Sequence, residues 1–157
     1  VLTRPAVALG LASATLAVWH VPVFFEAALR DDALHALEHL TLLATALLAW
    51  WPLLGPLPEW PRLAPPARLL YLFLAMIAMS AVAAPITLAD RVLYPFYERA
   101  GAAWPLAARA DQELAGIVMW MGGTLGYLIA GTLVFFRWAA AEERDERETQ
   151  AAASGGG

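Results

Sequence analysis

All three histidines of the chain lie between positions 20 and 39. His35 and His39 are four residues apart and therefore share one face of a helix, with Glu38 beside them. His20 precedes them across a short connection, residues 26–32, which predicts a hairpin that brings all three to one side. Two or three converging imidazole nitrogens suit copper or zinc and could also ligate haem. The spacing equally allows structural histidines, hydrogen-bonded to backbone or lipid headgroups, or a proton or redox relay.

The chain has no cysteine, so histidine, methionine or carboxylate side chains must hold any metal. Met119 is one candidate because a thioether is a soft ligand, although methionine also fills irregular gaps in apolar packing. Asp111 opens the last apolar segment, where a carboxylate either caps the helix or orients an imidazole. No G-x-S-x-G, phosphate-binding loop or H-E-x-x-H occurs, and no nucleophile is paired with a base. We therefore do not expect an enzyme.

The elements that must position these residues are predicted to be transmembrane helices. Apolar residues make up 61 % of the 157 residues, charged residues 15 %, and the mean hydropathy is +0.59. Four apolar stretches are long enough to cross a bilayer core of about 30 Å, at 6–25, 33–54, 69–89 and 114–136. The alternative is a water-soluble core of buried helices. We predict an all-α polytopic membrane protein with four helices in up-down order and short loops, including a proline-dense loop at 55–66.

The predicted organisation is one transmembrane domain, residues 1–138, followed by a charged, flexible tail, residues 139–157. Six of the ten arginines lie on the side of the tail and four on the other side, and the chain has no lysine. This bias favours a cytoplasmic tail and a histidine cluster facing the periplasm. The net charge of −4 offers no basic surface for phosphates, so nucleic acid is excluded as a partner.

Several motifs follow one another in an order that resembles the C-terminal half of the CtaG-type cytochrome c oxidase assembly factors. The resemblance covers roughly residues 5–138. The W-H-x-P, H-x-x-E-H and D-Q-x-x-A-G-x-x-M-W elements are together fairly specific. The matching segments are Trp19-His20-Val21-Pro22, His35-Ala36-Leu37-Glu38-His39, Trp50-Trp51-Pro52, Arg68-Leu69-Leu70-Tyr71-Leu72-Phe73, Leu93-Tyr94-Pro95 and Asp111-Gln112-Glu113-Leu114-Ala115-Gly116-Ile117-Val118-Met119-Trp120.

The resemblance implies a metallochaperone of the bacterial inner membrane that handles copper for a haem–copper respiratory oxidase. It implies His20, His35 and His39 as copper ligands. We expect Glu38, Asp111 and Met119 to be second-shell or auxiliary residues. Members of this family usually carry additional N-terminal spans, so we expect either a missing upstream segment or a shortened relative. Lipid and other integral membrane subunits are the expected partners.

Two other functions are compatible with the same residues. A shortened relative could serve as a structural or accessory subunit of a respiratory or photosynthetic complex, with its histidines hydrogen-bonded to neighbours or in contact with haem or pigment. The third possibility is a membrane haem protein with histidine ligands. Copper content and co-purification with a large complex would separate these functions.

Overall fold

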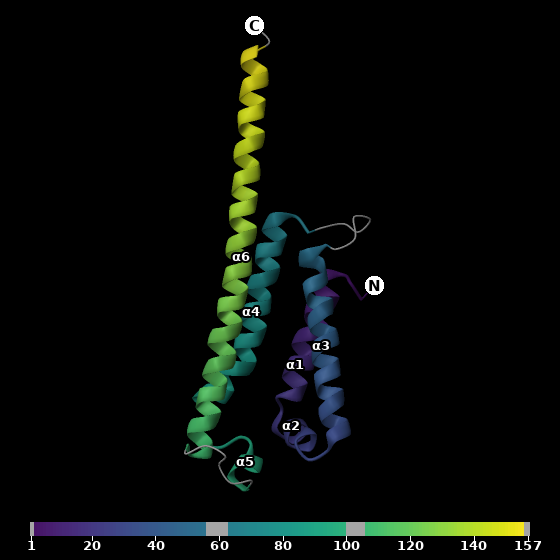
Figure 1. Cartoon of the computed structure of the whole chain (residues 1–157), viewed down its shortest axis with the longest axis vertical. Helices are drawn as coiled ribbons and strands as arrows, with labels where there is room; N and C mark the ends of the chain where they lie inside the picture. Colours follow the sequence, from purple (N-terminus) through teal and green to yellow (C-terminus); the bar gives the residue numbers. More distant parts are fainter. Residues whose placement is uncertain (1, 56–62, 100–105, 156–157) are drawn as a thin grey trace.

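The computed structural model describes residues 2–55, 63–99 and 106–155, and this part of the chain contains six α-helices and no strand (Figure 1). Most of the proline-dense loop, residues 56–62, lies outside the described residues. The helices, in chain order, are α1 (Pro5–Trp19), α2 (Pro22–Ala28), α3 (Asp32–Leu54), α4 (Pro65–Leu88), α5 (Pro95–Arg99) and α6 (Ala108–Gly155).

The helix ends follow local sequence signals. Pro5, Pro22 and Pro65 each occupy the first turn of a helix, where a missing N–H group is not needed for hydrogen bonding. Asp31 caps α3, because its carboxylate accepts hydrogen bonds from the backbone N–H groups of the next turn. Gly55 ends α3 in the left-handed conformation, with φ 49°.

The first predicted span, residues 6–25, is not one continuous helix. α1 ends at Trp19, and α2 continues at an angle of 76° to it. The reason is local, since Pro22 disfavours helical backbone at Val21, which is extended with ψ 128°. The 15 residues of α1 cover only about 22 Å, less than a bilayer core of about 30 Å.

The other three predicted spans each have a matching helix. α3, α4 and α6 are long and apolar enough to cross a membrane, and a fourth span results only if α1 and α2 are counted as one broken span. Many of their exposed side chains are large and apolar, as lipid-facing surfaces require; examples are Leu47, Leu128 and Phe136. The chain is therefore an all-helical protein with three membrane-spanning candidates, or up to four.

The helices form two neighbouring pairs, α1 with α3 and α4 with α6 (Figure 1). α4 also contacts α1 and carries most of the buried apolar side chains, so the core follows α4. Two glycines of α6 allow the close approach of α4: Gly116 faces Thr87, and Gly123 faces Met79. At one end of the molecule lie α2, α5, the first turns of α3 and the first turns of α6, which we call the α2–α5 end (Figure 1).

In the charged C-terminal segment α6 continues without a break to Gly155, and the side chains of residues 140–154 are exposed. Contacts four residues apart accompany this extension, from Trp138 to Glu142 at 2.8 Å and from Arg147 to Glu143 at 3.0 Å. The extension projects from the end of the molecule opposite to α2 and α5 (Figure 1).

Candidate metal centre and adjoining pocket

Three potential ligands converge in the first turns of α3. The Nε2 atoms of His35 and His39 are 2.9 Å apart, so one ring donates a hydrogen bond to the other. One ligand atom from each of His35, Glu38 and His39 lies within 4.8 Å of the other two. The i, i+3, i+4 spacing on a helix capped by Asp31 produces this convergence without help from any other element. We call these three residues the α3 triad.

The α3 triad combines accessible nitrogens with a protected oxygen donor. Both imidazoles are exposed, whereas Glu38 is buried, with 9 % of its surface accessible. Within the described residues no donor forms a hydrogen bond with the Glu38 carboxylate. The carboxylate therefore has acceptor capacity that a bound cation could use.

The geometry of the α3 triad also fits a metal ion. Metal–imidazole bonds of about 2.0–2.1 Å would place two tetrahedral nitrogens about 3.4 Å apart. The present separation of 2.9 Å needs only small side-chain rotations to reach that value. Two imidazole nitrogens and one carboxylate oxygen are donors that suit copper or zinc.

His20 does not belong to the α3 triad. It ends α1, and its Nδ1 atom donates a hydrogen bond to the carbonyl oxygen of Leu16 at 2.8 Å. Its ring lies beside Phe25, with 6.3 Å between the ring centroids. The helical spacing of α3 thus brings two of the three imidazoles together, and the third, His20, lines a different feature of the α2–α5 end.

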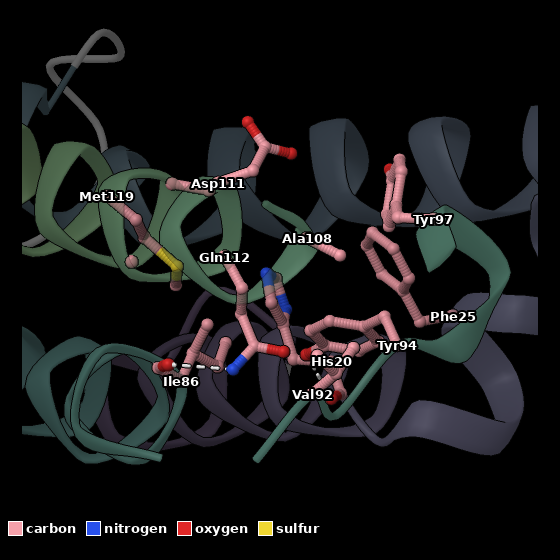
Figure 2. Close-up of a pocket in the computed structure, with 12 residues that line it drawn as sticks. His20, Phe25, Ile86, Val92, Tyr94, Tyr97, Ala108, Asp111, Gln112 and Met119 are labelled. Carbon is pink, nitrogen blue, oxygen red and sulfur yellow. Dashed lines mark hydrogen bonds between the residues drawn. The ribbon is translucent and has the colours of Figure 1, made fainter. Parts of the chain in front are cut away.

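That feature is a pocket of about 370 Å³ formed by the end of α1, α2, α4, α5 and the start of α6 (Figure 2). His20, Asp111 and Met119 all line it, so the structure divides the six predicted site residues into two groups of three. Tyr94 fixes one wall: its hydroxyl donates to the carbonyl oxygen of His20 at 2.9 Å, and its ring packs on Phe25 at 4.5 Å.

A family comparison covers both groups of residues. The family model described as cytochrome c oxidase caa3 assembly factor (Caa3_CtaG) matches residues 1–141, which include the α3 triad and the whole pocket. The chain belongs to this family. No curated protein and no solved structure matches it. The family assignment confirms the resemblance that the ordered motifs indicated.

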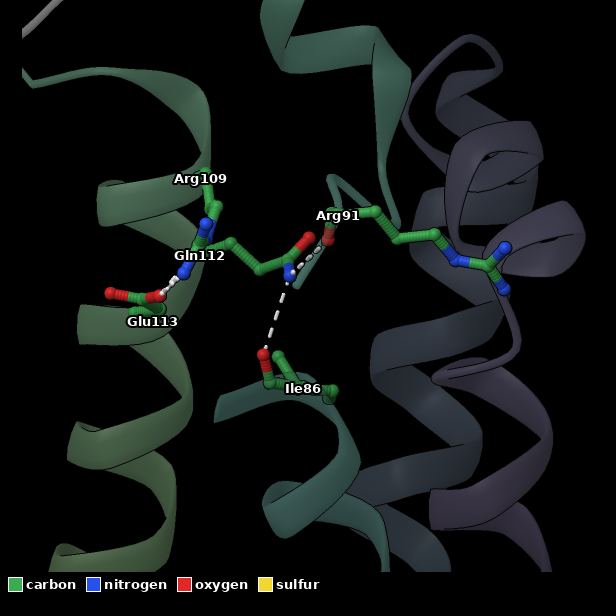
Figure 3. Close-up of polar contacts among 5 residues, drawn as sticks. All are labelled: Ile86, Arg91, Arg109, Gln112 and Glu113. Atoms are coloured by element: carbon green, nitrogen blue, oxygen red, sulfur yellow. Dashed lines mark hydrogen bonds and ion pairs between the residues drawn. The ribbon is translucent and has the colours of Figure 1, made fainter. Parts of the chain in front are cut away.

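Gln112 connects three parts of this CtaG-family protein beside the pocket (Figure 3). Its Oε1 atom accepts a hydrogen bond from the Leu93 N–H at 2.7 Å. Its Nε2 atom donates to the carbonyl oxygens of Ile86 at 3.3 Å and Arg91 at 3.2 Å. Because the side chain is buried, these bonds tie the connection after α4 to the first turn of α6.

The sequence predicted no contact for Gln112, Tyr94 or Phe25. Glu113 does have a local partner, since its carboxylate accepts from Arg109 at 3.0 and 3.1 Å (Figure 3). The only available signal was the position of Gln112 and Tyr94 inside two of the ordered motifs. The hydrogen-bond partners of Gln112 and Tyr94, which are Leu93 and His20, are distant from them in the sequence, so residue spacing could not reveal these bonds.

Tyr97 of α5 lies within electrostatic reach of both groups in the CtaG-family protein. Partial burial raises the pKa of its phenol, and the negative charges of Asp111 and Glu38 raise it further. α5 is held in place by Glu26 of α2, whose carboxylate accepts from the Phe96 N–H at 2.8 Å. The pocket and the α3 triad are therefore neighbours at the α2–α5 end, with Tyr97 near each.

Proposed function

We propose that this CtaG-family protein binds copper at the α3 triad and supplies it during assembly of a haem–copper oxidase. The observation that carries the proposal is the convergence of His35, Glu38 and His39 within 4.8 Å. Family membership supports oxidase assembly, and the donor set supports copper as the cargo.

The exposure of the two imidazoles suits delivery rather than storage. A chaperone must release its ion to a partner, so an accessible site with few ligands is favourable. Glu38 is shielded on one side while His35 and His39 face outward, which leaves an approach for a partner ligand. A buried carboxylate below two exposed nitrogens would hold the cation while exchange proceeds through the exposed face.

The proposal includes an orientation in the membrane. The arginine bias favours a cytoplasmic C-terminal end of α6, which places the α2–α5 end and the α3 triad at the periplasmic face of the inner membrane. A periplasmic position of the α3 triad is suitable for a protein that supplies copper to an oxidase from the periplasmic side of the membrane. Cysteine substitution at exposed positions 32 and 148, followed by labelling with a membrane-impermeant thiol reagent on intact cells, tests this orientation.

Metal analysis tests the copper site. The full chain is purified in detergent, loaded with Cu(I) under reducing conditions, freed of excess metal, and assayed for copper per chain. We expect H35A/H39A to lose one copper equivalent relative to the wild type. D32N is the matched control, because it removes an exposed carboxylate from the same helix end without touching the α3 triad.

Equal copper content in the wild type and H35A/H39A would overturn the copper proposal.

An experiment in cells tests the link to the oxidase. A strain carrying H35A/H39A should contain oxidase with reduced copper and reduced activity, whereas the D32N strain should match the wild type. Full oxidase activity with H35A/H39A, at equal protein level, would refute delivery through this site.

A further inference from the structure

We propose that a groove between α2 and α5 binds the phosphate group of an anionic phospholipid. The groove has a volume of about 630 Å³. It is lined by Glu26, Arg30, Phe96 and Arg99, and we call it the arginine groove. None of these residues belongs to the α3 triad or lines the pocket that contains His20. The proposal therefore does not depend on the copper role proposed above.

One carboxylate holds two guanidinium groups in the arginine groove. The Oε2 atom of Glu26 lies 2.5 Å from Nη2 of Arg30 and 3.6 Å from Nη2 of Arg99. Its Oε1 atom accepts a hydrogen bond from the Phe96 N–H at 2.8 Å. The two nitrogens therefore lie no further apart than the sum of their distances to this one oxygen. A single phosphate group spans such a gap with hydrogen bonds of about 2.7–2.9 Å to two of its oxygens.

The charges in the arginine groove leave an uncompensated positive charge. Two guanidinium groups face one carboxylate, and Glu98, which lies next to Arg99 in the sequence, does not line the groove. The exposed fraction of the side chain is 51 % for Arg30 and 67 % for Arg99, but only 14 % for Glu26. The two cations are thus accessible to a ligand, whereas the carboxylate that positions them is mostly covered.

The chemistry of these two cations favours a phosphodiester as the ligand. A guanidinium group presents several N–H donors in a planar fork that matches the oxygens of a phosphate. The contacts of Arg30 and Arg99 with Glu26 use only part of these donors. A phosphodiester without a neighbouring ammonium group carries a single negative charge, which balances the net charge of the groove. Phosphatidylglycerol has such a headgroup.

The position of the arginine groove in the molecule indicates a lipid rather than a free phosphate ion. α2 is bent by 76° from α1, so it runs across the end of the helical bundle instead of along it (Figure 1). α5 lies at the same end of the molecule (Figure 1). Short helices at the ends of membrane-spanning helices lie at the level of the lipid headgroups. Lipid phosphates are concentrated at this level, so the groove meets them without a search through the aqueous phase.

Apolar side chains beside the arginine groove provide a surface for acyl chains. Phe96 lines the groove itself. On α2, Val23 is 66 % exposed and Phe24 is 47 % exposed, and Val23 lies one helical turn before Glu26. Exposed apolar and charged side chains on one short helix are typical of helices that lie in the membrane interface. A phospholipid uses both kinds of side chain, whereas a free phosphate ion uses only the arginines.

A bound headgroup would connect α2 and α5 a second time. Glu26 already connects them through the Phe96 N–H and the contact with Arg99. α5 also carries Tyr97, which lines the pocket on the other side of the α2–α5 end. A ligand that binds only the folded state raises stability. We therefore expect an anionic phospholipid to stabilise the α2–α5 end, including this wall of the pocket.

Native mass spectrometry of the full chain in a non-ionic detergent tests the proposal. Phosphatidylglycerol is compared with phosphatidylethanolamine and with diacylglycerol of the same acyl chains, and the wild type should retain phosphatidylglycerol most strongly. R30Q and R99Q should each weaken this binding about fivefold, the contribution of one basic residue near anionic lipid. R109Q should bind like the wild type. It is the matched control, because Arg109 is an exposed, ion-paired arginine that does not line the groove.

A second measurement uses the unaltered chain and so does not depend on whether the variants fold. Phosphatidylglycerol should raise the thermal unfolding temperature of the wild type more than phosphatidylethanolamine or diacylglycerol does. Glycerophosphoglycerol, which is the headgroup without acyl chains, and inorganic phosphate should have no comparable effect. Equal stabilisation by the headgroup alone would overturn the assignment to a lipid. Equal retention of the three lipids, or undiminished binding of phosphatidylglycerol to folded R30Q/R99Q, would overturn the site itself.

Discussion

Replacing Gly116 by alanine should destabilise the contact between α4 and α6. A Cβ atom at this buried position would lie 2.9 Å from the backbone nitrogen of Thr87 and 3.0 Å from its Cα. Carbon atoms in favourable contact are about 3.5–4.0 Å apart, so the overlap is about 0.5–1 Å. Because the obstructing atoms are backbone, no side-chain rotation removes the overlap, and α6 must move away from α4.

The magnitude follows from the cost of overpacking. Forcing an extra methyl group into a packed contact costs about 1–3 kcal/mol. Gly122→Ala is the control, because nothing lies within 4 Å of its added Cβ atom. At that exposed helical position the substitution should be neutral or favourable by up to about 1 kcal/mol. The two variants should therefore differ by about 1–4 kcal/mol, although both make the same chemical change in one helix.

Equilibrium unfolding of both variants in the same detergent measures this difference. Gly116→Ala should unfold at a lower denaturant concentration and a lower temperature than the wild type. If Gly116→Ala were as stable as Gly122→Ala, the packing of α4 against α6 at Thr87 would be wrong.

Two further predictions concern the residues around the pocket. Gln112→Leu should destabilise the protein by about 1–3 kcal/mol, because the buried partners of the amide lose their bonds. Faster hydrogen exchange at the Leu93 amide would confirm it, and unchanged protection would contradict it. Burial raises the pKa of Tyr94 from 10.0 to about 12. Its contribution to stability is therefore present below pH 10 and lost as the pH rises from 10 to 12, because the unfolded chain releases the phenol proton first. Tyr94→Phe should reduce this alkaline loss of stability in unfolding curves, and an identical loss in both proteins would refute the assignment.

Features that depend on neighbours along the chain were predictable from the residues alone. Hydropathy indicated the helices α3, α4 and α6, because a long apolar run in a membrane must satisfy its own backbone hydrogen bonds. The spacing of His35 and His39 placed them on one helix face, and the structure shows their nitrogens in contact. The break at Pro22 was also local, but an average over the whole apolar stretch concealed it.

The contacts between helices required the tertiary structure. Whether His20 joins the α3 triad depends on how α2 turns the chain and how Tyr94 holds the end of α1, and neither is a property of spacing. The burial of Glu38 and the three bonds of Gln112 likewise arise from segments far apart in sequence. Helical periodicity determines which residues share a face, whereas packing of many side chains determines which faces meet. The sequence alone therefore indicated α3, α4 and α6 and the shared helix face of His35 and His39, and only the tertiary structure separated His20 from them and placed it with Met119 in one pocket.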